Sequence, residues 1–86
     1  MRYIVRLTTS ARKEALDLDD PVYERVRSAI DRLQEEPRPF GVRRLKGRHN
    51  VWRIRVGDYR VVYEIDDARG EITISHIKHR RDAYRH

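Results

Sequence analysis

The chain is 86 residues long, which predicts one domain with a thin core, because a chain of this size buries only about 60 to 65% of the surface that its unfolded form exposes. It contains no cysteine, which excludes disulfides, thiolate zinc sites and thiol nucleophiles and fits a reducing cytoplasm. The sequence has no secretory signal pattern and no apolar run of membrane-spanning length, so we expect a soluble cytoplasmic protein without a membrane partner, and the net charge of +6 favours a polyanionic one.

The positive charge is concentrated in two stretches, residues 43 to 60 and residues 76 to 86. Together they hold eleven of the twenty Lys and Arg residues but only two of the fourteen Asp and Glu residues. A field focused in this way suits a phosphate backbone, because each neutralised phosphate releases condensed counterions. The alternative is a solvated basic surface that binds nothing.

The N-terminal third predicts a strand followed by two helices. Residues 3 to 8 alternate as a half-buried strand does, and Thr9 or Ser10 is expected to cap a short helix over residues 11 to 18. Asp20 and Pro21 start the second helix. Its apolar stripe has helical spacing: Val22, Val26, Ala29, Ile30 and Leu33. The opposite face mixes both signs of charge, which favours a solvated surface over a membrane-binding one.

The rest of the chain predicts a loop and an antiparallel meander. Residues 39 to 50 form the loop, with Phe40 and Leu45 as expected anchors. Strands are predicted over residues 51 to 56, 59 to 65 and 71 to 78, with Gly57 and Asp58 in a two-residue turn and Trp52, Ile54, Val56, Tyr59 and Tyr63 packed in the core. The fold class is therefore α+β: an N-terminal strand, two helices and a three-stranded meander, forming one sheet with the helices on one face.

Three arginines are expected to share a face of this sheet. Arg53 and Arg55 point the same way from one strand, and the hairpin brings Arg60 near them. Such a cluster repels itself unless an anion or an acidic partner occupies it. The cluster therefore predicts an anion-binding site.

The C-terminal segment mixes cations with groups that can transfer protons. It carries Lys78, Arg80, Arg81 and Arg85 together with His76, His79 and Tyr84. Guanidinium groups near a phenol favour its anion, which could then act as a base. RNA supplies its own nucleophile, the 2′-hydroxyl, so cleavage needs only a base, cations for the crowded phosphorus and an acid for the leaving oxygen.

The histidines allow several readings. His49 is expected in solvent and His76 as a packed strand residue, whereas a chemical role for His79 stays open. No histidine pair has metal-ligand spacing with a carboxylate, so neither a metal nor any other cofactor is expected.

The segments WRIRVGDYRVVYEIDD (residues 52 to 67) and IKHRRDAY (residues 77 to 84), with the LKG at residues 45 to 47, resemble the RelE/ParE superfamily of type II toxins. The resemblance covers nearly the whole chain. It implies one of two activities: the RelE branch cuts mRNA in the ribosomal A site without metal, and the ParE branch inhibits DNA gyrase. It also implies a cognate RelB-like antitoxin, acidic and partly disordered, in a toxin–antitoxin hetero-oligomer.

By position, the resemblance also assigns site residues. Arg60 matches an arginine at the scissile phosphate, Arg80 an arginine with a transition-state or general-acid role, and Tyr84 a C-terminal tyrosine that assists the 2′-hydroxyl or stacks on a base. The expected RNA-binding residues are Arg53, Arg55, Lys46, Arg81 and His79. Arginine at positions 53 and 55, where some relatives have lysine, favours bidentate phosphate binding over proton transfer, and the spacing from Arg80 to Tyr84 is shorter than in some members.

These observations predict a metal-independent endoribonuclease that cleaves ribosome-bound mRNA by attack of the 2′-hydroxyl and so inhibits translation. Two alternatives remain. One is a gyrase inhibitor of the ParE type without nuclease activity, and the other is a degenerate toxin that binds only its antitoxin or an operator complex.

Overall fold

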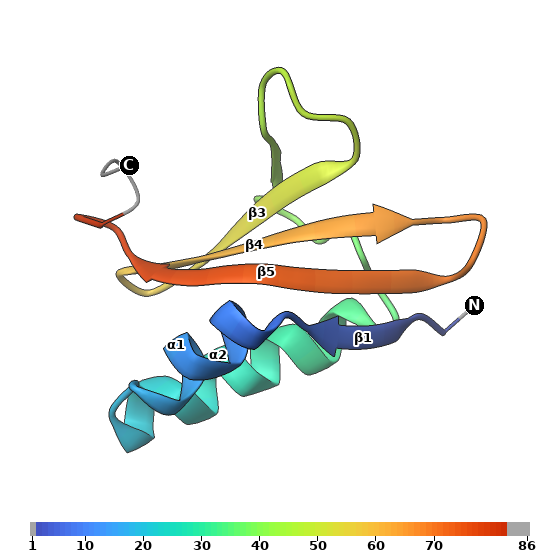
Figure 1. Cartoon of the computed structure of the whole chain (residues 1–86). Helices are drawn as coiled ribbons and strands as arrows, with labels where there is room; N and C mark the ends of the chain where they lie inside the picture. Colours follow the sequence, from blue (N-terminus) through green and yellow to red (C-terminus); the bar gives the residue numbers. More distant parts are fainter. Residues whose placement is uncertain (1, 83–86) are drawn as a thin grey trace.

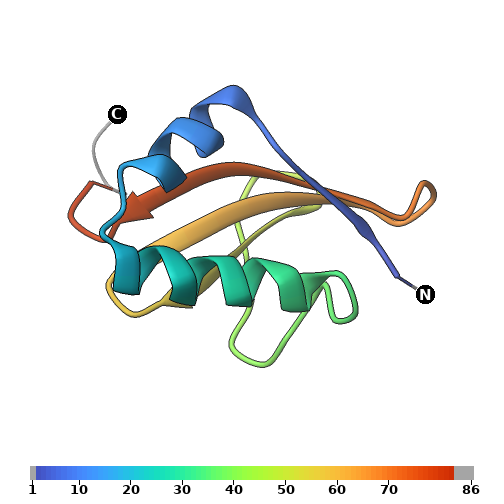
Figure 2. The ribbon, with the colours of Figure 1, turned by 90° about the horizontal axis from the view of Figure 1, so that it is seen from below.

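The chain forms a five-stranded mixed sheet with both helices on one face (Figures 1 and 2). The structure is a computed structural model and describes residues 2–82. In chain order the elements are β1 (Ile4–Leu7), α1 (Thr9–Leu16), α2 (Asp20–Leu33), β2 (Arg43–Arg44), β3 (Val51–Val56), β4 (Tyr59–Asp66) and β5 (Glu71–His79). The strand order across the sheet is β1-β5-β4-β3-β2. The predicted α+β class, with helices on one face of one sheet, is confirmed.

The first strand lies beside the last and runs parallel to it. Ile4 pairs with Glu71 and Leu7 with Ile74. The two helices carry the chain across one face of the sheet between β1 and the antiparallel meander, as a parallel pairing requires a long connection. Neither helix in residues 2–82 is long and apolar enough to cross a bilayer.

Helix α1 is capped by Thr8, so the expectation of Thr9 or Ser10 as the cap was wrong. The Thr8 hydroxyl accepts a hydrogen bond from the backbone N–H of Ala11 at 3.1 Å, and its own N–H donates to the carbonyl of Ile74 at 2.9 Å. Thr8 therefore continues the backbone bonding of β1 to β5 by one residue and also caps the helix. Its tertiary bond to β5 decides which of the adjacent hydroxyl residues takes the cap position.

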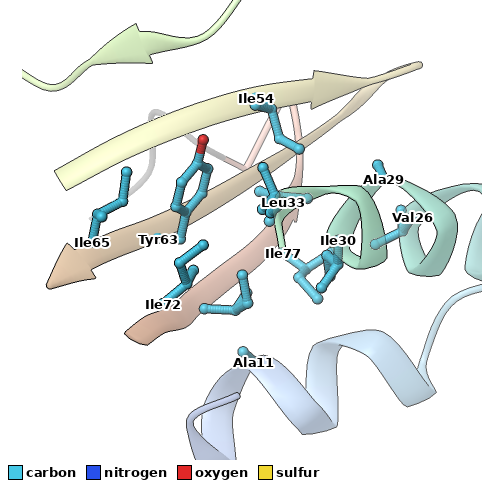
Figure 3. Packing of buried hydrophobic residues seen from close by; sticks show 12 residues of the cluster. Ala11, Val26, Ala29, Ile30, Leu33, Ile54, Tyr63, Ile65, Ile72 and Ile77 are labelled. Atoms are coloured by element: carbon cyan, nitrogen blue, oxygen red, sulfur yellow. The ribbon is translucent and has the colours of Figure 1, made fainter. Parts of the chain in front are cut away.

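The core lies between the helices and the sheet (Figure 3). The predicted stripe of α2 is confirmed, because Val26, Ala29, Ile30 and Leu33 are buried. From the sheet, the predicted inward residue Ile54 is buried, and Trp52 and Val56 pack against the cluster. The other buried members are Ala11, Val61, Tyr63, Ile65, Ile72, Ile74 and Ile77.

The segment before β3 is more ordered than the predicted loop. Arg43 and Arg44 form the short strand β2, paired with Arg53 and Trp52. Phe40, expected as an anchor, is fully exposed, and that expectation was wrong. Val42 packs against the core in its place, after a turn in which its N–H donates to the carbonyl of Pro39 at 3.0 Å.

The turn between β3 and β4 and a bulge in β5 set which side chains of the meander face away from the helices. The predicted two-residue turn is present, with Val56 opposite Tyr59 and Gly57 at φ 60°, a conformation that glycine adopts at little cost. In β5, the register shifts so that Val62 pairs with His76 but Tyr63 pairs with Ile74. Ser75 is the extra residue of this bulge, and its hydroxyl donates to the carbonyl of Val62 at 3.2 Å.

Candidate functional site

A groove of about 370 Å³ lies on the sheet face away from the helices. Its lining residues are Leu45, Arg48, Val51, Arg53, Arg60, Val62, Ser75, His76, Lys78 and Asp82. We call it the basic groove, because its lining has four Lys or Arg residues and a single acidic one, Asp82. The chain segment between α2 and β3 rises on the same side of the sheet and forms one flank (Figure 1).

Strand register brings the two central arginines to this groove. Arg53 of β3 pairs with Val62 of β4, so both side chains lie on the groove face of the sheet, while the neighbouring Ile54 points into the core. Arg60 lies two residues before Val62 on β4 and is paired with Lys78 of β5. The structure thus brings Arg53 and Arg60 together, as the hairpin pattern predicted.

Arg55 is placed differently from these two arginines. It pairs with Arg60 across the hairpin, yet it is exposed and lines a second groove between α2 and β3, where Ile54, Leu33 and Phe40 also lie. The strand β2 begins at Arg43, opposite Arg53, so within residues 2–82 its pairing does not reach the edge of β3 beside Arg55. The basic groove consequently contains two of the three predicted arginines.

The loop before β3 contributes Arg48 rather than Lys46 to the basic groove. Lys46 is exposed and lines a separate hollow of about 320 Å³ with Arg44 and His49. Arg48 lines both this hollow and the basic groove. Lys46 therefore extends the basic surface beyond the groove, along the loop.

The segment after β5 turns back toward the sheet. The N–H of Arg80 donates to the carbonyl of Asp58 in the β3–β4 turn at 2.7 Å, and the N–H of Asp82 donates to the carbonyl of His79 at 2.9 Å. Arg80 and Arg81 have exposed side chains, and Asp82 lines the basic groove. Tyr84, the remaining predicted catalytic residue, lies outside the described residues.

His79 lies outside the lining of the basic groove because of its pairing between β4 and β5. It pairs with Tyr59, a residue that packs against the core, and the two rings form an edge-to-face contact with centroids 5.2 Å apart. Its Nδ1 accepts a hydrogen bond from the N–H of Arg81 at 3.3 Å. The structure therefore gives His79 packing and turn contacts, and it does not bring the ring to Arg53 or Arg60.

Four ionisable groove residues were missing from the predicted site: Arg48, His76, Lys78 and Asp82. Both Lys78 and His76 depend on the bulge at Ser75, because a regular hairpin would pair Arg60 with Ile77 and turn Lys78 and His76 to the face of the sheet that the helices cover. The trace of the bulge in the sequence is the spacing of the buried isoleucines, because Ile72 and Ile74 are two residues apart whereas Ile77 follows three residues later.

A carboxylate from α1 reaches the rim of the basic groove. Glu14 Oε2 lies 2.8 Å from Lys78 Nζ, and its other oxygen, Oε1, lies 3.9 Å from His76 Nδ1. The hydrogen bond from Lys78 to Glu14 and the attraction between their charges raise the pKa of the Lys78 ammonium. Within residues 2–82 no three His, Asp or Glu side chains gather as metal ligands would.

The basic groove can bind an anion by charge and shape. Its guanidinium and ammonium groups are cations that can neutralise phosphates and stabilise charge that develops on phosphorus. The apolar side chains Val51, Val62 and Leu45 also line it, and apolar surface of this kind suits the face of a nucleobase. The arrangement has the chemistry of a nucleic-acid site.

Comparison with known proteins agrees with the fold and the sequence pattern. The family model for the ParE toxin of the type II toxin–antitoxin system parDE matches residues 5–84. The toxin RelG of Mycobacterium tuberculosis is 34% identical over 86 residues, covering 99% of each chain. A chain of the archaeal RelE–RelB complex from Pyrococcus horikoshii superimposes with a TM-score of 0.82 and 33% identity, covering 93% of this chain and 97% of that one. A chain of the RelBE2 toxin–antitoxin complex of Mycobacterium tuberculosis superimposes with a TM-score of 0.80 and 30% identity, covering 92% of this chain and 99% of that one. The chain therefore belongs to the RelE/ParE family of type II toxin–antitoxin toxins.

Proposed function

We propose that this toxin is a metal-independent endoribonuclease that cleaves mRNA in the ribosomal A site. The observation that carries the proposal is the basic groove, in which Arg53, Arg60 and Lys78 from three adjacent strands surround an open space large enough for part of a nucleotide chain. Such a site suits cleavage of RNA in the cytoplasm, because the substrate supplies the 2′-hydroxyl nucleophile and the protein must mainly hold the backbone and stabilise charge.

In the proposed reaction the 2′-oxygen attacks the adjacent phosphorus as its proton passes to a base. A new bond forms between the 2′-oxygen and phosphorus, the bond to the 5′-oxygen breaks, and the leaving oxygen takes a proton from an acid. The products are a 2′,3′-cyclic phosphate and a 5′-hydroxyl. Arg60 and Arg53 stabilise the crowded, negatively charged phosphorus.

The remaining site residues are assigned by family resemblance. Arg80 is proposed to serve the leaving oxygen and Tyr84 the 2′-hydroxyl or a base. The proposed flanking RNA contacts come from Lys46, Arg55, Arg81 and His79. Lys46 and Arg55 lie outside the basic groove, which makes contact with the path of the mRNA or with ribosomal RNA their most direct role.

We also propose that an acidic RelB-like antitoxin neutralises this toxin in a hetero-oligomer. Two of the similar chains, at 33% and 30% identity, come from a RelE–RelB complex and from the RelBE2 toxin–antitoxin complex. The net charge of +6 favours an acidic partner. Co-expression with the product of the adjacent reading frame is expected to restore growth.

Primer extension on an abundant mRNA, after brief induction in bacteria, tests the nuclease proposal. Wild type is expected to produce new 5′ ends within translated codons, and Arg60→Ala is expected to lower their yield about a hundredfold or more. Arg12→Ala, which removes an exposed arginine from α1, is the matched control. Unchanged cleavage by a folded Arg60→Ala protein would refute the role of Arg60.

Inhibition of DNA gyrase is the second candidate, favoured by the match to a family model described for ParE toxins. In that case induction would leave mRNA intact, produce DNA breaks and induce the damage response. Intact mRNA with normal growth would instead indicate a toxin that has kept only its binding functions.

A further inference from the structure

Glu14 occupies the edge of β5 at the point where β1 ends. The last pair of the parallel ladder is Leu7 with Ile74, and α1 continues along the same edge of the sheet (Figure 2). There the N–H of Ile77 donates to Glu14 Oε1 at 2.8 Å. The carboxylate thus takes the place of a neighbouring strand, and this bond fixes it beside the next residue, Lys78.

The second oxygen of this carboxylate holds Lys78. Its Oε2 lies 2.8 Å from Lys78 Nζ, and the side chains of Glu14 and Lys78 are 23% and 40% exposed, so the pair is partly shielded from solvent. Lys78 also faces Arg60 across β4 and β5 and lines the basic groove. The ammonium therefore stands between a fixed carboxylate and the space proposed for RNA.

We propose that Lys78 is a phosphate-binding residue of the basic groove and that Glu14 sets its affinity for RNA by competing with the phosphate for the ammonium. This inference rests on the proposed RNA-cleaving function. Cα atoms of directly opposed residues in an antiparallel pair lie about 4.5 to 5.5 Å apart, so Lys78 and Arg60 can bind one phosphate or two adjacent ones. With Glu14 in place, Lys78 adds less to non-specific binding than an unpaired lysine would.

The alternative is an ion pair that only stabilises the fold. Partly exposed ion pairs contribute little to stability, and such a role would change the melting temperature of variants without changing RNA binding. The two readings therefore differ in the salt dependence of RNA binding, because only a contact with phosphate releases a counterion from RNA.

The test measures toxin binding to ribosomes programmed with an mRNA whose A-site codon carries 2′-O-methyl groups and so cannot be cleaved. Affinities are determined over a series of salt concentrations for wild type, Lys78→Gln, Lys78→Arg and Glu14→Gln. The controls are Lys13→Gln on α1 and Glu24→Gln on α2, which change the net charge equally at exposed positions. Thermal melting establishes that each variant is folded, and Lys78→Met replaces Lys78→Gln if that variant is not.

Lys78→Gln is expected to weaken binding about tenfold and to lower the slope of log affinity against log salt by about 0.7, whereas Lys78→Arg binds like wild type. Glu14→Gln keeps an oxygen for the N–H of Ile77 but removes the charge, so it is expected to bind more tightly and with a steeper slope. In the Lys78→Gln background the same change is expected to have only the small effect of Glu24→Gln.

Each part of the inference can fail separately. Equal binding by Lys78→Gln and Lys13→Gln would show that Lys78 does not bind phosphate. Equal effects of Glu14→Gln and Glu24→Gln would overturn the competition. Wild type that neither binds programmed ribosomes nor cleaves unmodified mRNA would instead reject the proposed function itself.

Discussion

The hydroxyl of Tyr63 donates a hydrogen bond to the carbonyl oxygen of Pro37 at 2.7 Å, inside the core. Tyr63 is completely buried at the centre of β4, and burial raises the pKa of its phenol. This bond joins the end of the α2 segment to the sheet and so fixes where the chain starts toward β2 and the flank of the basic groove.

Replacing Tyr63 with phenylalanine is expected to lower the free energy of unfolding by about 1 to 2 kcal/mol, because the buried carbonyl of Pro37 loses its donor. Denaturant unfolding followed by circular dichroism measures this change. Tyr3→Phe is the control, since the Tyr3 hydroxyl bonds to Asp67 at the surface, and it should cost less. Equal losses in the two variants would contradict the importance of burial.

The cap assignment predicts different costs for adjacent hydroxyl residues. Thr8→Ala is expected to destabilise the protein by about 1 kcal/mol, because the N–H of Ala11 loses its acceptor. Thr8→Ser should keep most of that stability. Thr9→Ala and Ser10→Ala lie within the exposed first turn and should be close to neutral. A larger loss for either of them than for Thr8→Ala would show that the cap lies elsewhere.

Arg53 and Arg55 are expected to differ in their effect on RNA binding, although both come from one strand. Arg53 lines the basic groove and Arg55 lines the groove between α2 and β3. Arg53→Gln should therefore weaken binding to programmed ribosomes about tenfold, and Arg55→Gln clearly less. The comparison has a matched charge, since each variant loses one guanidinium. Equal losses would mean that the mRNA path covers both grooves.

Acid pH should weaken the surface cluster of Tyr3, Arg38 and Asp67, which joins three segments of the chain. Hydrogen bonds from Arg38 at 2.9 Å and Tyr3 at 2.7 Å hold the pKa of Asp67 below its usual value. A depressed folded-state pKa stabilises the protein above the unfolded pKa, and that contribution is lost as the pH falls below about 4 through the folded value.

Unfolding curves recorded from neutral to strongly acid pH test this contribution. Asp67→Asn is expected to be less stable than wild type at neutral pH and to approach it in acid. Asp31→Asn, at an exposed position of α2, serves as the control. A constant difference between Asp67→Asn and wild type across the pH range would show that the carboxylate charge plays no part.

The sequence alone determined the elements whose signals are local. The helical stripe of α2, the alternation in β3 and the turn at Gly57 each depend on neighbouring residues, and each was predicted correctly. The meeting of Arg53 and Arg60 also follows, because a two-residue turn leaves only one simple register for the hairpin. The class of fold and the basic character of one sheet face could therefore be predicted.

Tertiary structure decided the features that depend on distant segments. The cap falls on Thr8 because β5 accepts its N–H in the ladder, and Phe40 stays exposed because Val42 takes the core contact. The bulge at Ser75 brings His76 and Lys78 to the groove face; the spacing from Ile74 to Ile77 breaks the alternation of β5, but only the pairing with β4 makes Ser75 the extra residue. Glu14 reaches Lys78 only because β1 stops short and leaves the edge of β5 to α1. Hydrophobic periodicity reports which face of an element is buried, but pairing between elements decides which polar side chains meet.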